Sequence, residues 1–184
     1  MRDVLSFFRA LLASPSEVGA LLPSSRHLAA AMGAAAAELD SGGQVIEIGA
    51  GSGALTQALI THFGRERLQI IECAPALVDL LQQRFPHARI VAARAEDWLQ
   101  AAPRQTPGSL LVSSLPFKSL PAVTAHRLAH RYQQLVLQGA RLLQFSYGVY
   151  PPFSLAPDRG LRWQQKRRIW LNLPPATIWE LTSG

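Results

Sequence analysis

The stretch that decides the fold is Val45-Ile46-Glu47-Ile48-Gly49-Ala50-Gly51-Ser52-Gly53-Ala54-Leu55, in which a short apolar strand leads into a glycine-rich turn and then into a helix over 54–63. Closely spaced glycines let the backbone turn tightly, adopt positive φ angles and approach a ligand with no Cβ in the way. A second apolar strand, 68–71, ends at Glu72. A glycine turn after the first strand and an acid after the second predict an open α/β nucleoside site, with the acid on the ribose.

Glu47, the acid before the turn, separates two kinds of nucleoside site. The dinucleotide pattern is G-x-G-x-x-G, whereas this turn reads G-x-G-x-G and follows an acid at the end of a buried strand. An unpaired carboxylate there is costly, so we expect Glu47 to have a cationic or hydrogen-bonding partner. A turn that only joins strand to helix would leave both acids unexplained.

The pattern E-x-G-x-G-x-G resembles the first motif of class I S-adenosylmethionine (SAM) methyltransferases, whose acid meets the amino-acid end of the cofactor. The resemblance implies SAM as the cofactor. The residues that it places around SAM in this first part of the site are Glu47, Gly49, Ala50, Gly51, Gly53 and Glu72.

Length and composition limit the class of protein. The 184 residues fit a single domain, 1–184, that can bury a sizeable core, and no apolar run reaches the ~18 residues of a membrane span. Cys73 is the only cysteine, so no internal disulfide is possible and a reducing cytosol is compatible. We expect no metal site.

The charge of the chain is strongly positive. The net charge is +6, and sixteen of the eighteen basic residues are arginine. Such a surplus favours phosphate-bearing partners, either nucleic acid or anionic lipid. A genome rich in G and C also favours arginine codons, so the charge alone does not decide between these partners.

Residues 1–13 form a candidate amphipathic helix. Apolar residues recur there at helical spacing, and the segment is too short and too interrupted for a secretory signal. Such a helix either packs on the domain or lies on a membrane surface, and phenylalanines beside arginines suit the membrane surface. The predicted membrane contacts are Arg2, Phe7, Phe8, Arg9, Leu11 and Leu12.

The rest of the chain alternates between helical and strand patterns. A short helix is predicted over 16–22 and a longer one over 26–39, capped by Ser24 or Ser25. The later helices are expected at 54–63, at 75–85 and around 126–131, and the strands at 44–48, 68–72, 89–92, 109–114, 142–148, 162–171 and 177–181. The predicted fold class is α/β: a Rossmann-like methyltransferase domain with N-terminal helices added. Its seven-stranded sheet is mostly parallel, with an antiparallel C-terminal strand.

The loop after the third strand departs from the methyltransferase pattern. SAM enzymes usually have Asp-Ala there, with the acid on the adenine amino group, but Arg94 stands in the place of that aspartate. Ala95 can still offer its backbone, and Glu96 or Asp97 is a candidate acceptor for the adenine. These two acids also fit the solvated start of a helix, where the dipole favours negative charge.

The strand 109–114 predicts the catalytic loop, since such loops follow the carboxyl end of a central strand. Ser113 is a candidate cofactor contact, and Ser114-Leu115-Pro116-Phe117 follows. In amino methyltransferases that act on adenine or glutamine, the loop reads Asn/Asp-Pro-Pro-Tyr or Asn-Leu-Pro-Tyr and accepts hydrogen bonds from the target nitrogen. Ser114 is a shorter acceptor, so we expect the target to sit differently.

Over almost its whole length, the chain resembles bacterial phospholipid N-methyltransferases. The resemblance rests on Phe8-Arg9, Pro23 to Arg26, Glu47 to Gly53, Ser113 to Pro116, Gln144 to Gly148 and Trp170 to Ala176. It implies stepwise transfer of up to three methyl groups from SAM to the amine of phosphatidylethanolamine, towards phosphatidylcholine. It also implies a cytoplasmic enzyme held peripherally on the inner face of the cytoplasmic membrane by its N-terminal helix. The expected partners are this lipid and an anionic membrane surface, with no nucleic acid, and we expect a monomer.

Three residues are candidates for the reaction itself. Tyr147, at the end of the fifth strand, is placed to orient the amine, and Ser114 to accept from it. His27 is a candidate proton acceptor. A tyrosine in a core and a histidine that only caps or packs are the structural alternatives. Arg26 or Arg168 is expected to bind the lipid phosphate by charge-assisted hydrogen bonds.

Two other functions compete with this reading. An RNA adenine N6-dimethyltransferase shares the fold and a similar loop, but here Ser114 and Phe117 replace the expected Asn and Tyr, and no helical RNA-binding domain follows Leu181. A catalytically inactive membrane-binding protein with a vestigial SAM fold is the second rival, and Arg94 is the residue that favours it.

Overall fold

The computed structural model describes residues 23–101, 108–156, 160–172 and 174–183. One seven-stranded sheet runs through it in the order β3-β2-β1-β4-β5-β7-β6. The strands are β1 (Val45–Ile48), β2 (Leu68–Glu72), β3 (Arg89–Ala92), β4 (Leu110–Ser113), β5 (Arg141–Tyr147), β6 (Leu161–Ile169) and β7 (Ala176–Ser183). The first five strands pair in parallel, and β7 is antiparallel to both of its neighbours. The predicted sheet is therefore confirmed.

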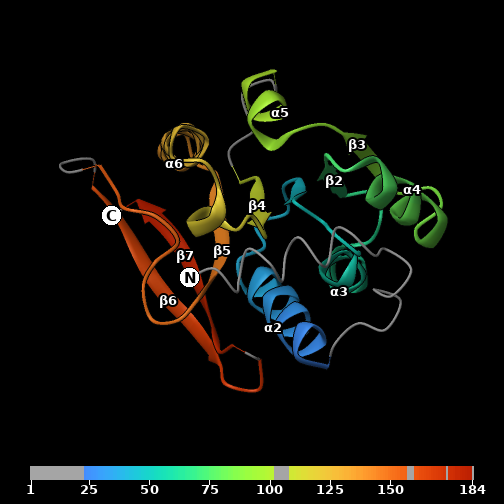
Figure 1. Ribbon diagram of the computed structural model, residues 1–184, viewed down its shortest axis with the longest axis horizontal. Helices are drawn as coiled ribbons and strands as arrows, with labels where there is room; N and C mark the ends of the chain where they lie inside the picture. Colours follow the sequence, from blue (N-terminus) through green and yellow to red (C-terminus); the bar gives the residue numbers. More distant parts are fainter. Residues whose placement is uncertain (1–22, 102–107, 157–159, 173, 184) are drawn as a thin grey trace.

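Helices cover both faces of the sheet (Figure 1). They are α2 (Pro23–Glu38), α3 (Ala54–Phe63), α4 (Pro75–Arg84), α5 (Ala95–Ala101) and α6 (Ala122–Leu137), with a short 3-10 turn, η2 (Phe117–Ser119). One core cluster joins α2, α3 and α4 to one face, and a second joins α5 and α6 to the other. Because both faces are covered, β1, β2 and β4 are buried along their whole length, as parallel strands usually are.

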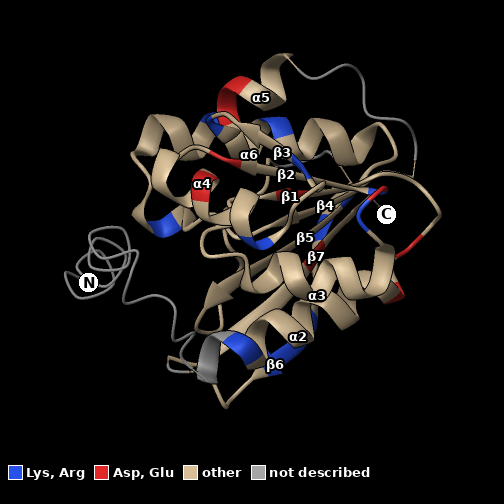
Figure 2. Cartoon of the chain, turned by 90° about the vertical axis from the view of Figure 1, so that its right-hand side faces the viewer, with Lys and Arg blue, Asp and Glu red and all other residues tan. Residues whose placement is uncertain are grey.

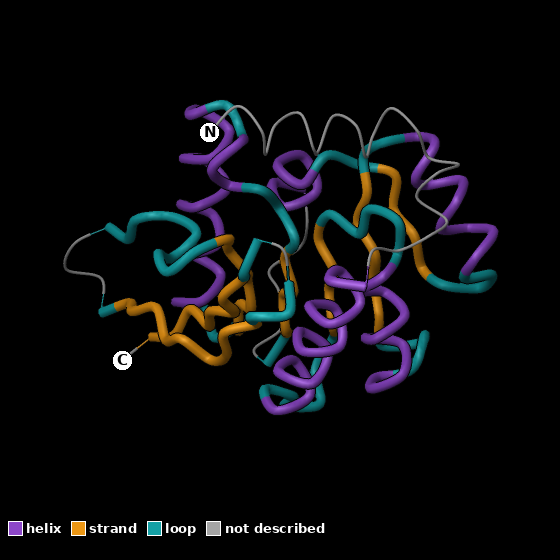
Figure 3. The backbone as a smooth tube through the Cα atoms, turned by 60° about the horizontal axis from the view of Figure 1, so that its bottom comes forward, coloured by secondary structure: helices purple, strands orange, loops and turns teal. Residues whose placement is uncertain are grey.

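Helix α4 lies beside β2 and β3 at one end of the sheet, and the β6–β7 pair lies at the other (Figure 3). Strand β6 pairs only with β7 and so forms the edge. In the sequence, β6 comes before its inner neighbour β7. The chain therefore leaves a gap beside β5 when it continues to β6, and β7 then returns antiparallel and fills that gap.

Most predicted elements match the structure, and two boundaries differ in an informative way. The expected bounds 54–63, 68–72 and 89–92 are confirmed. The prediction that Ser24 or Ser25 caps the long helix is wrong, because helix already includes Pro23, and proline is favoured in a first turn. Strand β6 ends at Ile169, two residues before the predicted end, so the residues after it lie in a loop. The predicted helices over 1–13 and 16–22 lie outside the described residues.

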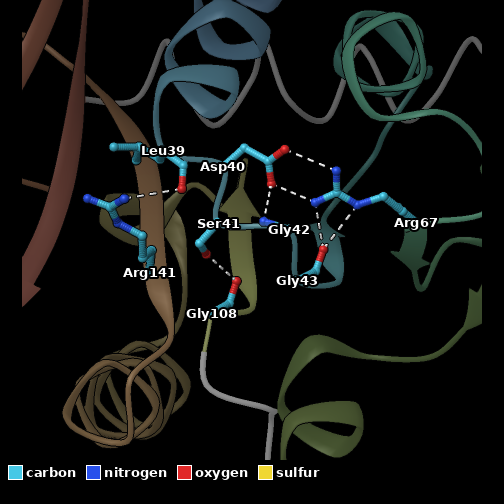
Figure 4. Close-up of polar contacts among 8 residues, drawn as sticks. All are labelled: Leu39, Asp40, Ser41, Gly42, Gly43, Arg67, Gly108 and Arg141. Atoms are coloured by element: carbon cyan, nitrogen blue, oxygen red, sulfur yellow. Dashed lines mark hydrogen bonds and ion pairs between the residues drawn. The ribbon is translucent and has the colours of Figure 1, made fainter.

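A polar cluster fixes the turn between α2 and β1 (Figure 4). The Arg67 guanidinium pairs with both carboxylate oxygens of Asp40 and donates to the Gly43 carbonyl at 2.8 Å. The Ser41 hydroxyl donates to the Gly108 carbonyl at 2.8 Å. The hydrogen bond from Arg67 is the main cause that lowers the pKa of Asp40. These contacts link the amino ends of β1, β2 and β4, at the opposite end of the strands from the glycine turn.

Acidic partners neutralise much of the basic run on β6. The buried Glu180 of β7 pairs with Lys166 at 3.3 Å and with Arg141 at 3.1 Å. Arg167 pairs with Glu38 of α2. A basic run on an edge strand either protects that strand from pairing with another chain or binds phosphate. Because two of its three consecutive cations already have carboxylate partners, the run as a whole is not a free phosphate site.

In the described part of the chain, we find no helix that combines the length and the apolar character needed to cross a bilayer.

Candidate functional site

The three glycines of the turn have different neighbours. All have positive φ angles: +79° at Gly49, +58° at Gly51 and +84° at Gly53. A Cβ on Gly53 would lie 2.6 Å from the ring of Phe85, and one on Gly49 would lie 3.0 Å from Leu115. A Cβ on Gly51 would meet nothing within 4 Å. Packing therefore disfavours a side chain strongly at Gly53 and less so at Gly49, whereas Gly51 faces open space where a ligand can approach the backbone.

Glu72 joins the end of β2 to this turn. One carboxyl oxygen accepts from the Gly51 amide at 2.9 Å, and the other accepts from the amides of Cys73 and Ala74 at 2.8 and 3.0 Å. The side chain is 7% exposed. Three backbone donors hold the carboxylate beside Gly51, and its predicted role at the ribose stays a prediction.

Glu47 is completely buried on β1. One oxygen accepts from the Thr56 hydroxyl at 2.7 Å, so the predicted hydrogen-bonding partner exists. The other oxygen, Oε1, has no hydrogen-bond partner among the described residues. Burial raises the pKa of Glu47 to about 8, and the nearby Glu72 charge adds to the rise. Below that pH the carboxyl is therefore mostly neutral until a cation approaches.

Thr56 is a residue that the sequence reasoning missed. It lies three positions after Gly53, in the first turn of α3, and is fully buried. A threonine so soon after the glycine turn, on a helix that packs over the end of β1, was the available signal. Its hydroxyl provides the hydrogen bond that a buried acid at Glu47 requires.

A hydrogen bond from α6 fixes the start of the loop after β4. The Tyr132 hydroxyl, fully buried, donates to the Ser113 hydroxyl at 3.0 Å, and burial strongly raises the pKa of this tyrosine. The Leu115 amide approaches the same Ser113 oxygen at 3.4 Å. Ser113 was predicted to contact the cofactor, but its hydroxyl is directed into the core and helps to fix the loop. The cofactor role of Ser113 stays a prediction.

Gln144 on β5 supports the same loop from the side. It pairs with Ser113 in the sheet register, and its side-chain amide donates to the Leu115 carbonyl at 2.9 Å and to the Phe145 carbonyl at 3.1 Å. Its own carbonyl oxygen is buried and has no hydrogen-bond partner among the described residues. The sequence marked Gln144 only as part of a motif, and the structure shows the contact that it makes.

No protein-family model matches the chain. One curated relative, the probable ribosomal RNA small subunit methyltransferase A of Methanosarcina mazei, is 33% identical over 115 residues. The match covers 62% of this chain and 40% of the relative, so the chain spans about two fifths of the length of this relative.

Solved methyltransferases have the same arrangement of strands and helices. The magnesium protoporphyrin IX methyltransferase of Synechocystis PCC 6803, solved with bound SAM, is 14% identical with a TM-score of 0.58, over 84% of this chain and 76% of that chain. A putative RNA methyltransferase from Pyrococcus horikoshii is 12% identical with a TM-score of 0.53, over 85% and 83% of the two chains. The fold is that of class I methyltransferases. A variant of MtNAS in complex with SAM also shares it, at 16% identity and a TM-score of 0.57, over 96% and 70%.

In this methyltransferase fold, the loop after β3 carries an ion pair. Arg94 donates to one oxygen of Glu96 at 2.8 and 3.1 Å, and the arginine side chain is 62% exposed. Glu96 and Ala95 belong to the first turn of α5. The proposed adenine acceptor therefore already binds the residue that replaces the usual aspartate. The roles of Ala95 and Glu96 at the cofactor stay predictions.

Two of the three candidate catalytic residues, Ser114 and Tyr147, lie at the carboxyl ends of β4 and β5. Ser114 follows β4 directly and donates its amide to the Ile48 carbonyl at 2.9 Å, which places it beside the end of β1. Tyr147 ends β5; its ring meets Phe145 edge-on at 5.4 Å, and Lys118 of η2 donates to its carbonyl at 3.5 Å. Burial raises the pKa of Tyr147, so its phenol stays protonated at neutral pH.

His27 and Arg26 are exposed on α2. Their roles in the reaction and in phosphate binding stay predictions. Arg168, half-buried on β6, lies with its guanidinium carbon 4.1 Å from the centre of the Trp170 ring. The predicted membrane contacts from Arg2 to Leu12 lie outside the described residues.

The residues of this edge fit SAM. A buried carboxyl oxygen without a partner suits the cationic amino-acid end, the open side of Gly51 leaves room, and the Glu72 carboxylate is fixed beside it. Within the described segments, no cluster of three or more histidine, cysteine, aspartate or glutamate side chains could hold a metal ion.

Proposed function

We propose that this protein is a SAM-dependent methyltransferase that acts on the amine of a phospholipid head group, phosphatidylethanolamine and its mono- and dimethyl forms. The observation that carries the first half of the proposal is the fully buried Glu47, whose Oε1 has no partner in the described structure and lies next to a glycine turn tied to Glu72. A neutral or inert ligand would leave this oxygen uncompensated, whereas the ammonium group of SAM would supply the missing positive charge.

Each part of the cofactor has a candidate contact. Glu47 would hold the amino-acid end, Gly49 to Gly53 would approach the middle of SAM with their backbone, and Glu72 would bind the ribose. SAM, when bound, supplies an activated methyl group. The tasks left to the protein are to align the amine, exclude water and remove a proton.

The phospholipid substrate is supported by the way three distant stretches meet. These stretches, 113–116, 144–148 and 170–176, carry the resemblance to phospholipid N-methyltransferases. Gln144 donates to the Leu115 carbonyl, and the Gly148 amide donates to the Pro175 carbonyl at 3.1 Å. These two contacts link the three stretches, which supports the proposal that they contribute to one substrate site.

The amine would be held between Ser114 and Tyr147. Ser114 offers a short acceptor, and the protonated phenol of Tyr147 can accept a hydrogen bond through its oxygen without carrying charge. The face of its ring suits a methylated ammonium product, at about 0.5–2 kcal/mol for a good contact. We assign proton acceptance to His27 and contact with the lipid phosphate to Arg26 or Arg168. Residues 1–13 would attach the protein, as a monomer, to the anionic inner face of the cytoplasmic membrane.

The direct test is incubation with methyl-labelled SAM and vesicles that contain phosphatidylethanolamine, followed by separation of the mono-, di- and trimethylated lipids. We expect labelled lipid from the wild-type chain and none from a Glu47→Gln variant that folds but binds SAM poorly. SAM binding without any labelled lipid would overturn the phospholipid substrate. Absence of SAM binding would overturn the cofactor as well.

RNA is the second candidate substrate, because the curated relative from Methanosarcina mazei is a probable ribosomal RNA methyltransferase. Against it, Ser114 and Phe117 occupy the positions of the Asn and Tyr expected in RNA adenine dimethyltransferases, and Phe117 is buried at 6% exposure. The same assay with a small-subunit ribosomal RNA fragment decides the matter. Label in adenine and none in lipid would favour RNA.

A further inference from the structure

Four exposed apolar side chains gather on two loops that meet at the edge of the sheet carrying the candidate site. Among the described residues, six large apolar side chains are exposed, and four of them belong to these loops: Val149 (48%), Tyr150 (71%), Trp170 (69%) and Leu171 (75%). We call these four residues the apolar rim. Exposed apolar residues scattered singly need no explanation, but a cluster of this kind marks an interaction surface.

The two loops are bonded to each other. The Gly148 amide donates to the Pro175 carbonyl at 3.1 Å, and the Thr177 hydroxyl donates to the Gly148 carbonyl at 2.6 Å. Tyr147 and Ile169 both pair with Ala176, so β5 and β6 deliver their loops to the same edge on either side of β7. The apolar rim is therefore a single surface at the carboxyl ends of β5 and β6.

Local contacts hold the rim outward. The side chain of Asn172, only 4% exposed, donates to the Pro174 carbonyl at 2.7 Å and fixes the turn that follows Leu171. The Arg168 guanidinium lies over the Trp170 ring. On the other loop, the Ser146 hydroxyl donates to the Tyr150 carbonyl at 2.6 Å. Trp170 and Leu171 stay exposed beside these contacts, which makes them candidates for an interaction surface.

The charge around the rim is positive. The stretch 147–176, which carries both rim loops, has five lysines and arginines and a single acid, Asp158, and two of the five pair with Glu180 and Glu38. Figure 2 shows blue segments on β6 and red ones on α5, while α4 carries both colours. Each rim loop also has its own cation, Lys118 beside Tyr147 and Arg168 on Trp170. Tryptophan and tyrosine with lysine and arginine at their side are typical of groups that sit at a membrane–water interface.

From this combination we propose that the apolar rim docks on an anionic lipid bilayer, with Trp170 and Leu171 inserted at the interface, as a contact separate from residues 1–13. The inference rests on the proposed function, since it explains how the site meets a head group that stays in the bilayer. Aromatic rings and cations also suit single-stranded RNA, which stacks on aromatic faces. The aliphatic Leu171 and Val149 offer no stacking face and favour lipid.

The test measures vesicle binding by the full chain without SAM, so that no turnover is involved. The vesicles contain phosphatidylglycerol and phosphatidylethanolamine. We expect the double variant Trp170→Ala, Leu171→Ala to bind them about tenfold more weakly or worse, because each buried side chain adds substantially to association. Leu137→Ala is the matched control: this exposed leucine ends α6, before β5 begins at the amino edge. The control should bind like the wild type, and SAM affinity should be unchanged in all three proteins.

Tryptophan fluorescence supplies an independent readout. Trp170 is exposed, whereas Trp98 and Trp163 are half-buried and Trp179 is 7% exposed. Lipids with brominated acyl chains should therefore quench wild-type emission, and a Trp170→Phe variant should lose most of this quenching while it still binds vesicles. Quenching that is the same in both proteins would contradict insertion of Trp170.

The outcomes separate this inference from the proposed function. Equal vesicle binding by the wild type and the double variant would overturn lipid docking by the apolar rim, even if the protein methylates phosphatidylethanolamine in detergent micelles. Vesicle binding that depends on the apolar rim, without methylation of any lipid, would support lipid docking and overturn the proposed phospholipid substrate. A dimer that disappears in the double variant, seen by sedimentation velocity, would identify a second copy of the chain as the occupant and overturn lipid docking.

Discussion

The Thr56 hydroxyl donates a 2.7 Å hydrogen bond to one carboxyl oxygen of Glu47 and leaves the other oxygen without a hydrogen-bond partner in the described part of the chain. The acid is thus half satisfied in the free protein. Burial keeps its pKa near 8, so it carries a proton at neutral pH. A cation at Oε1 would complete the site and favour the charged form.

We expect SAM binding at pH 7 to release up to about one proton, because the bound cation lowers the pKa of Glu47 below the pH of the solution. Titration calorimetry in two buffers with different ionisation enthalpies measures this release. Heats that are equal in the two buffers would show that Glu47 does not change protonation.

The same group makes stability depend on pH. The pKa of Glu47 is about 8 in the folded protein against 4.5 for its ordinary value, so the folded state binds more protons between these pH values. The stability that Glu47 contributes is therefore complete below pH 4.5 and is lost as the pH rises towards 8. Relative to Glu47→Gln, the wild type should lose up to about 1.4 kcal/mol per pH unit across this window. Urea unfolding of both proteins at several pH values checks the difference, and parallel curves would contradict it.

Alanine substitutions at two glycines of the turn should have different effects on SAM binding and on stability. Gly53→Ala should destabilise the protein by about 2–5 kcal/mol, because the roughly 1–2 kcal/mol of its positive φ adds to the clash of its Cβ with Phe85 at 2.6 Å, about 1–3 kcal/mol. Gly51→Ala meets no atom within 4 Å, so it should cost only the roughly 1–2 kcal/mol of a positive φ and mainly weaken SAM binding. Denaturant unfolding and SAM titration of both variants test the contrast. Normal SAM affinity in a folded Gly51→Ala protein would place the ligand elsewhere.

Tyr132→Phe removes the hydroxyl that donates to Ser113 while the ring stays in place. We expect a loss of about 0.5–1.5 kcal/mol of unfolding free energy, together with a lower kcat, because the loop after β4 loses its support. The affinity for SAM should change little. Unchanged stability would mean that this buried hydrogen bond contributes nothing net.

Gln144→Leu should affect the substrate side of the site. It removes the Gln144 donor, so the Leu115 carbonyl keeps only its hydrogen bond from the Phe117 amide, at a cost of about 0.5–1.5 kcal/mol for the lost bond. With lipid as the substrate, kcat should fall, while the dissociation constant for SAM stays the same. A variant with wild-type kcat would remove Gln144 from the machinery that positions the loop.

The cofactor half of the site could be predicted from sequence because its chemistry is local. Glu47 and the glycines lie within seven residues, and Glu72 ends the next strand, so strand order alone brings them together. The Tyr132–Ser113 contact could not be predicted, since it depends on how α6 packs over β4. The partner of Arg94 is only two residues away, but whether that arginine turns to Glu96 or towards the cofactor depends on its side-chain conformation.

The two strands at the C-terminal end of the fold were predicted, but the predicted end of the first of them was wrong. Prolines and a strand pattern indicated the final pair of strands, but the periodicity continued through Trp170 and Leu171 and assigned them to a strand. In the structure the strand ends at Ile169, and the next two side chains leave the sheet. A pattern of apolar residues cannot tell a buried strand end from an exposed tip, because both carry the same residue types.

The position of β7 between β5 and β6 has a consequence for how the protein is made. The edge strand leaves the ribosome before the strand that must hold it, so β6 waits unpaired until β7 has been translated. Because β6 has only β7 as a neighbour in the sheet, we expect the two strands to join it together. The surface that joins Tyr150 to Trp170 is therefore complete only once the last strand of the domain is in place.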